Sequence, residues 1–250
     1  MLSGLLDAVT FLTRVPLRTH EHNDASIARA VPWFPVVGAL VGLFVAGVYS
    51  GALFVLPSFI AAALAIASGL IATGAFHEDG LADVADAFGG GRDREDRLRI
   101  LKDPRLGTYG VLAVVFAALL RVGAVGTFTR IDALIAIPAA HALSRAASIA
   151  AMGSFKPVHE GLGASYTRAL TSGRVLAGAA LGSLIAAALL RVWVLPAAAV
   201  AFVVLLVMGR LARRKIGGIN GDVLGAIQQL TEIGVLLVVV AVLARGHALY

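Results

Sequence analysis

The hydrophobic residues of this chain gather in long runs, which short polar or glycine-rich segments separate. A helix needs about 20 mostly apolar residues to cross a bilayer, and irregular backbone is not tolerated in the hydrocarbon. The sequence therefore predicts an all-α, polytopic transmembrane helical bundle that forms a single integral membrane domain over residues 1–250. We predict about seven spans, at residues 33–52, 58–76, 109–128, 132–152, 174–191, 193–212 and 223–244.

The N-terminal segment has a different pattern. Its apolar residues recur near helical spacing, at Leu2, Leu5, Leu6, Val9 and Leu12. This spacing is typical of an amphipathic helix that lies in the membrane interface. We therefore expect an N-terminal interfacial helix, and the pattern leaves open whether this segment crosses the membrane.

Composition supports a membrane protein. Hydrophobic residues make up 59% of the chain and charged residues 14%, whereas a soluble domain is about half apolar and a quarter charged. The chain has no cysteine, which excludes a disulfide framework, a thiolate metal site and a thiol nucleophile.

The net charge of +6 reflects basic residues that cluster between the apolar runs. This distribution indicates membrane orientation by the positive-inside rule and argues against nucleic acid as a partner. With the N-terminus in the cytoplasm, the outside segments hold only Arg130, Arg191 and Arg245 among the basic residues, and Asp132 among the acidic ones. The polar chemistry is then cytoplasmic, in loops at about 77–108, 153–173 and 213–222.

Three aspartates follow the second predicted span. Asp79, Asp83 and Asp86 are spaced i, i+4, i+7, so on a helix they share one face. Like charges on one face favour a bound cation, and carboxylate oxygens suit Mg²⁺ or Mn²⁺. A solvated helix end is the alternative. We favour the metal site because these carboxylates adjoin an apolar span in a chain poor in charge.

Two further features accompany the aspartates. His77 and Glu78 precede them and are candidates for a proton acceptor or for supporting polar groups. Gly80, which follows Asp79, would let a substrate approach the backbone.

A basic loop precedes the third predicted span. It contains Lys102, Asp103, Arg105 and Thr108 beside glycine and proline. Arg105 and Lys102 are suited to hold phosphate, the arginine through its bidentate fork. Membrane anchoring by positive charge is the alternative, and it accounts for Lys102 equally well.

The third polar element, at residues 213–232, begins with a glycine-rich turn. Asn220 and Asp222 in this turn are candidates for substrate binding, and a helix N-cap is the alternative for Asp222. Glu232 lies within the last span, where an unpaired carboxylate is expensive. It should face the bundle interior near a cation or near Arg145, which is either a substrate ligand or the structural partner of Glu232.

Several motifs resemble a known family in the correct order along the chain. They are F-H-E-D-G-L-A-D-V-A-D-A-F-G-G (76–90), L-K-D-P-R-L-G-T-Y-G (101–110) and G-G-I-N-G-D-V-L-G-A (217–226). The chain resembles cobalamin synthase, the adenosylcobinamide-GDP ribazoletransferase family. The resemblance implies a polytopic enzyme of the last steps of cobalamin biosynthesis. Such an enzyme uses Mg²⁺ to join adenosylcobinamide-GDP to alpha-ribazole or its phosphate and releases GMP.

The site predicted from the residues and the resemblance has two groups of members. The catalytic group comprises His77, Asp79, Asp83 and Asp86, and the three aspartates are also the metal ligands. The substrate- and phosphate-binding group comprises Lys102, Asp103, Arg105, Thr108, Arg145, Asn220, Asp222 and Glu232. Departures from the family pattern at Glu78, Asn220 and Gln229 weaken the role of the 217–232 segment.

Two other functions compete with this one. A CDP-alcohol-type phosphotransferase usually carries Asp-Gly-x-x-Ala-Arg, whereas Leu-Ala-Asp follows Gly80 here. A cation-coupled transporter would account for Glu232 and Arg145 inside the membrane. As partners we expect the two substrates and the lipid bilayer, in the cytoplasmic membrane of a prokaryote, and a homo-oligomer is left open.

Overall fold

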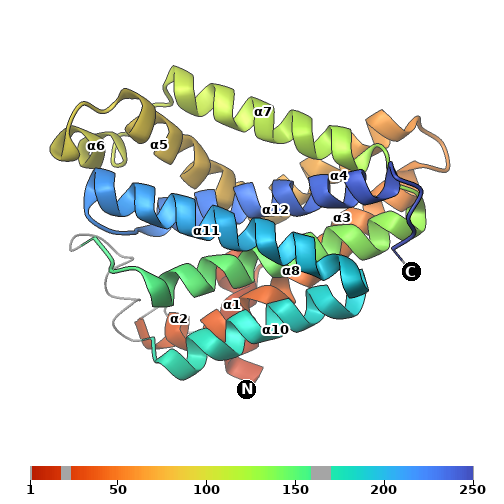
Figure 1. The fold of residues 1–250 in the computed structure, drawn as a ribbon, viewed down its shortest axis with the longest axis horizontal. Helices are drawn as coiled ribbons and strands as arrows, with labels where there is room; N and C mark the ends of the chain where they lie inside the picture. Colours follow the sequence, from red (N-terminus) through yellow and green to blue (C-terminus); the bar gives the residue numbers. More distant parts are fainter. Residues whose placement is uncertain (1, 18–23, 159–169, 250) are drawn as a thin grey trace.

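The fold is helical throughout the part of the chain that is described. The computed structural model describes residues 2–17, 24–158 and 170–249, and its only extended feature there is an isolated bridge between Pro157 and Ile219. The helices are α1 (Leu2–Leu12), α2 (Asp24–Ala30), α3 (Phe34–Ala52), α4 (Ser58–Thr73), α5 (Phe76–Gly90), α6 (Arg94–Ile100), α7 (Thr108–Val125), α8 (Arg130–Ser154), α10 (Ser172–Leu190), α11 (Val194–Ile216) and α12 (Gly221–Leu243). The all-α prediction is confirmed, and Figure 1 shows the long helices lying side by side.

Six of the seven predicted spans, all but the one at 58–76, each coincide with one helix. Five segments are long and apolar enough to cross a membrane. One of them, Ser172–Ile216, comprises α10 and α11, which Figure 1 shows folded back on each other. Both spans predicted in this region therefore have a helix of their own. The chain is a membrane protein with a polytopic helical bundle.

The span predicted at 58–76 differs from the expectation of one continuous helix. The helix α4 ends at Thr73, and α5 leaves it at an angle of 92°, so that only the bent pair together reaches the length of a span. Gly74 and Ala75 form the bend with φ values of 69° and 56°. A positive φ is unfavourable for alanine and marks a backbone that its surroundings hold in place. We treat the five segments as the membrane-spanning part and α5 as a helix at its boundary.

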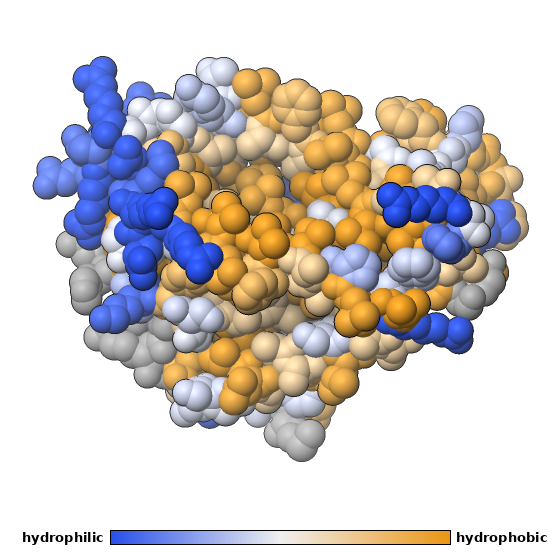
Figure 2. Space-filling view, in the orientation of Figure 1, coloured by the Kyte–Doolittle hydropathy of each residue, from blue (hydrophilic) through white to orange (hydrophobic). Residues whose placement is uncertain are grey.

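The surface has the character expected for a bundle in lipid. Figure 2 shows hydrophilic residues gathered at the two ends of the molecule, with a largely apolar band between them. Large apolar side chains such as Phe44, Phe116 and Phe202 are exposed on the described helices. An exposed apolar surface of this extent is stable only against another apolar phase, here lipid.

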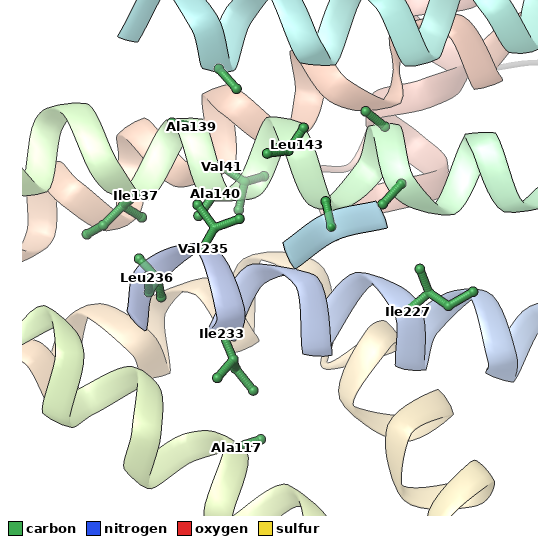
Figure 3. Close-up of a cluster of buried hydrophobic side chains, with 14 of the residues drawn as sticks. Val41, Ala117, Ile137, Ala139, Ala140, Leu143, Ile227, Ile233, Val235 and Leu236 are labelled. Atoms are coloured by element: carbon green, nitrogen blue, oxygen red, sulfur yellow. The ribbon is translucent and has the colours of Figure 1, made fainter. Parts of the chain in front are cut away.

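The helix α8 lies at the centre of the bundle. In its most apolar window 78% of the residues are buried, against 28% for α7. Figure 3 shows Ile137, Ala140 and Leu143 of α8 packed between Val41 of α3 and Val235 of α12. Small residues bring these helices close together, as membrane packing requires.

A network of four buried charges joins α5 to the rest of the bundle. Arg121 of α7 donates a hydrogen bond to Glu78 of α5 over 2.8 Å and lies 3.6 Å from Glu232 of α12. Arg145 of α8 donates to the other oxygen of Glu232 over 3.1 Å. All four side chains are at least nine-tenths buried. We call Glu78, Arg121, Arg145 and Glu232 the charge network.

Two glutamines donate further hydrogen bonds to this network. Gln228 donates to Glu232 over 2.7 Å, and Gln229 donates to Glu78 over 3.0 Å. Two carboxylates therefore balance two guanidinium groups inside the bundle, which is the condition for burying charge in a low-dielectric interior. The predicted pairing of Glu232 with Arg145 is confirmed.

The packing of α3 against α8 provides a first prediction. A Cβ atom on Gly42 would come within 2.7 Å of the Pro138 backbone, whereas one on Gly47 would meet nothing within 4 Å. We expect Gly42→Ala to destabilise the protein by about 1–3 kcal/mol through overpacking. Gly47→Ala is the matched control and should leave stability unchanged or raise it, because alanine is the better helix former. Thermal unfolding in detergent would measure both, and equal midpoints would contradict the proposed close contact.

The charge network provides a second prediction. Arg121→Gln leaves Glu78 buried without its ion pair, and we expect a loss of about 3–5 kcal/mol in stability. The double variant with Glu78→Gln removes the unpaired charge as well and should recover part of this loss. Arg99→Gln, which breaks the exposed pair with Asp96, should leave the unfolding midpoint unchanged. A double variant as unstable as the sum of its single changes would refute the coupling.

Candidate functional site

Asp79, Asp83 and Asp86 form what we call the acidic face of α5, which begins directly after the buried Glu78. Glu78 is buried, whereas the next residue, Asp79, is exposed, and Asp83 and Asp86 are half-buried. Partial burial, followed by the charges of Asp79, Asp222 and Asp86, raises the pKa of the Asp83 carboxyl to about 7. The structure thus brings the predicted aspartates into electrostatic contact, and it adds Asp222 from α12.

Asp86 has a structural contact that spacing alone does not reveal. One of its carboxylate oxygens accepts from the Gly107 N–H over 2.7 Å, and the other accepts from the Gly110 N–H over 2.9 Å. These amides belong to the start of α7, where free N–H groups favour a carboxylate. Asp86 therefore fastens the basic loop to α5, and its predicted role as a metal ligand stays a prediction.

The glycine-rich turn before α12 places Asp222 beside α5. Asn220, not Asp222, is the N-cap, because its Oδ1 accepts from the Val223 N–H over 3.0 Å. Its amide donates to Asp222 over 2.7 Å. A Cβ atom on Gly80 would lie 2.9 Å from the Asp222 carbonyl oxygen. Gly80 thus admits α12 at the position where we expected substrate.

These carboxylates suit a magnesium ion only in part. Among the described residues no group of three or more histidine, cysteine, aspartate or glutamate side chains is arranged to hold a metal ion. Mg²⁺ is usually held by one or two carboxylates, with waters and substrate phosphates completing its octahedron. Asp79 and Asp83, whose charges interact with each other and with Asp222, could contribute the one or two carboxylates of such a shared site. A cage formed only by Asp79, Asp83 and Asp86 of α5 does not fit a magnesium ion.

Two cavities adjoin the acidic face. One, of about 560 Å³, is lined by Asp79 together with Arg14, Thr13 and Thr73. We call it the Arg14 cavity. The other, of about 940 Å³, is lined by Asp86, Arg105, Thr108 and polar residues of α6. Carboxylates and guanidinium groups thus line the same spaces, as recognition of a metal-bound phosphate requires.

Arg14 was not among the predicted site residues. Its backbone N–H donates to the Ala72 carbonyl oxygen over 2.8 Å, and its side chain covers Gly74 at the bend between α4 and α5. The motif F-L-T-R-V-P at 11–16 contained the signal. Only the fold shows that this arginine shares a cavity with Asp79.

The basic loop presents its charges at the surface. Arg105 donates through Nε and Nη2 to the two Asp103 oxygens, over 2.9 and 2.8 Å, so its fork is occupied. These hydrogen bonds lower the pKa of the Asp103 carboxyl to about 2. Thr108 is the first residue of α7 and lines the larger cavity with Arg105, whereas Lys102 is exposed outside that lining.

Other predicted site residues lie away from the acidic face. Arg145 and Glu232 are buried and paired with each other, so the structure supports the structural alternative for both, and substrate binding by either stays a prediction. His77 is buried at the start of α5. Most of the predicted catalytic loop at 153–173 lies outside the described residues, which end at 158 and resume at 170.

Comparison with known proteins identifies the family of this chain. The family model described as cobalamin-5-phosphate synthase, CobS, matches residues 4–240. A Sinorhizobium medicae protein named adenosylcobinamide-GDP ribazoletransferase is 40% identical over 243 residues, covering 92% of each chain. A protein of the same name from Ralstonia pickettii is 38% identical over 251 residues, covering 93% of each chain. No solved structure matches. The chain belongs to the cobalamin-5-phosphate synthase family.

Proposed function

We propose that this protein is an adenosylcobinamide-GDP ribazoletransferase, acting in the final step of cobalamin synthesis. Family membership over residues 4–240 carries this proposal, together with relatives of that name at about 40% identity. The acidic face beside arginine-lined cavities is the matching chemistry, because a diphosphate substrate needs both cations and their ligands. The substrates are adenosylcobinamide-GDP and alpha-ribazole or its phosphate, and the protein works in the cytoplasmic membrane.

The reaction is a phosphoryl-group transfer. A hydroxyl oxygen of ribazole forms a bond to the phosphorus nearer the corrinoid, and the bond from that phosphorus to the bridging oxygen breaks. GMP leaves with the bridging oxygen. The proton of the attacking hydroxyl passes to a carboxylate of the acidic face or to His77. Little covalent chemistry falls to the protein, so its contribution is positioning and charge neutralisation.

Each group of side chains has a part in this reaction. One or two of Asp79, Asp83 and Asp222 would hold Mg²⁺, which would supply a positive charge that stabilises the phosphate oxygens during transfer. Arg14 lies in the same cavity as Asp79 and binds phosphate oxygens there. Arg105 is paired with Asp103 and exchanges this partner for phosphate when the substrate arrives. The acidic face and the basic loop are on the cytoplasmic side, where nucleotide substrates are found.

The structure argues against the transporter. Glu232 and Arg145 are ion-paired, and the cavity that both of them line measures only about 20 Å³. A space of that size holds about one water molecule and does not accommodate a transported solute. A CDP-alcohol-type phosphotransferase differs in its released nucleotide, so the assay below separates GMP from CMP.

The acidic face provides a third prediction. In purified protein with adenosylcobinamide-GDP, alpha-ribazole and Mg²⁺, we expect Asp83→Asn to lower the turnover number for GMP release by about 100-fold or more, because it removes charge that holds the metal and substrate. Asp132→Asn is the matched control. It makes the same change in the first turn of α8, away from the acidic face, and should retain turnover. Both variants must show wild-type membrane insertion.

Three results would contradict this proposal. They are absence of GMP release by the wild-type protein, release of CMP from a CDP-alcohol donor instead, and full Mg²⁺-dependent turnover by a correctly inserted Asp83→Asn protein. Removal of Mg²⁺ by a chelator should stop the reaction, and added Mg²⁺ should restore it.

A further inference from the structure

A third cavity, beside the acidic face, has walls of a different kind. It measures about 250 Å³, and α1, α3, α5, α8 and α12 contribute residues to its lining. Phe11, Phe34, Phe76 and Leu12 form apolar walls, and His77, Arg145, Ser148 and Gln228 are its polar members. We call it the aromatic cavity. Arg145 is the one member of the charge network that lines it, and the aspartates of the acidic face do not.

The rings in this cavity form a connected set. Phe11 stacks on Phe34 with centroids 5.4 Å apart and an interplanar angle of 5°. Phe76 meets Phe11 edge to face at 5.5 Å, and His77 meets Phe76 edge to face at 5.2 Å. Stacked and edge-to-face rings present flat surfaces and polarised edges, which favour a planar aromatic guest over a flexible chain.

His77 is the polar side chain of this cavity that is available to a ligand. It is 6% exposed, and neither ring nitrogen has a hydrogen-bond partner among the described residues. Ser148 instead donates to the Leu224 carbonyl oxygen, and Gln228 donates to Ser144 and Glu232. A poorly solvated polar group without a partner is unfavourable, so a ligand with a complementary atom would be favoured in this cavity.

The aromatic cavity adjoins the reaction site on two sides. Phe11 and Phe76 also line the Arg14 cavity, in which Asp79 lies. Gly221, the neighbour of Asp222, lines the aromatic cavity from α12. A molecule with an apolar ring in the aromatic cavity therefore reaches the acidic face with the group attached to that ring.

We propose that the aromatic cavity binds the planar base of the nucleoside substrate, with His77 hydrogen-bonded to the free ring nitrogen of that base. This inference rests on the proposed function. Ribazole is a nucleoside whose base is a methylated benzimidazole, so its base is flat and apolar apart from one nitrogen with a lone pair. The cavity volume is below the about 300–1,000 Å³ of sites for drug-sized ligands, which suits a bicyclic base and excludes the corrinoid.

This placement orders the reactants. The sugar, attached to the base, extends from Phe76 toward Asp79, and its hydroxyl group then faces the diphosphate that the acidic face holds. His77 positions the base in this arrangement, so the proton of the hydroxyl passes to a carboxylate of the acidic face and not to His77. The transfer itself is the one described above, with the hydroxyl oxygen bonding to phosphorus and GMP leaving.

A cavity-filling variant tests the proposal. Leu12 and Leu205 are both buried leucines, and each lines an apolar cavity: Leu12 the aromatic cavity, and Leu205 a cavity of about 150 Å³ between α8, α10 and α11. In the GMP-release assay of the full chain, we expect Leu12→Phe to raise the KM for ribazole about tenfold or more by filling the space for the base. The KM for adenosylcobinamide-GDP should not change. Leu205→Phe is the matched control and should change neither.

A substrate series makes the test independent of folding. The wild-type protein should discriminate against a ribosyl imidazole, which lacks the fused ring, and Leu12→Phe should reduce this discrimination because the smaller base still fits. Absence of GMP release by the wild-type protein would refute the proposed function itself. Normal wild-type turnover with equal ribazole KM values for Leu12→Phe and Leu205→Phe would overturn only the cavity assignment. So would a bound lipid chain that the wild-type protein retains and Leu12→Phe lacks.

Discussion

Four buried charges, those of Glu78, Arg121, Arg145 and Glu232, connect α5 to α7, α8 and α12. A single carboxylate or guanidinium group in a low-dielectric interior is unstable, so Glu78, Arg121, Arg145 and Glu232 persist only as a balanced set. Its members come from α5, α7, α8 and α12. Because Glu78 is the third residue of α5, the network fixes the start of that helix within the bundle, directly after the bend at Ala75.

Fixing the start of α5 determines what its next residues meet. Asp79 follows Glu78 immediately and is exposed to the Arg14 cavity, while Phe76 and His77 line the aromatic cavity. The first turn of α5 therefore borders three environments: the buried ion pairs, the Arg14 cavity and the aromatic cavity. Gly80 and Gly225 let α5 and α12 approach closely enough for this division, with the His77 carbonyl oxygen 3.2 Å from a Cβ atom built on Gly225.

The sequence predicted the features that depend on local pattern or on the cost of charge in lipid. The helices follow from apolar runs, and the pairing of Glu232 with Arg145 follows because neither is stable alone within a span. Tertiary contacts were harder to predict from the sequence. The same cost argument requires a carboxylate for Arg121, but only the fold identifies Glu78, which lies 43 residues away. The amide contacts of Asp86 likewise depend on how α7 meets α5.

The contrast between the two kinds of acidic residue explains how one bundle combines a rigid interior with a reactive surface. Glu78 and Glu232 are neutralised by arginines, so they cannot also bind a cation from solution. Asp79 and Asp83 repel each other and have no ion pair among the described residues; partial burial, with Asp79 as the first of the neighbouring charges, accordingly raises the pKa of Asp83. Positive charge that arrives with a diphosphate substrate relieves this repulsion. Substrate binding and metal binding would then reinforce each other, because each supplies what the other lacks at the acidic face.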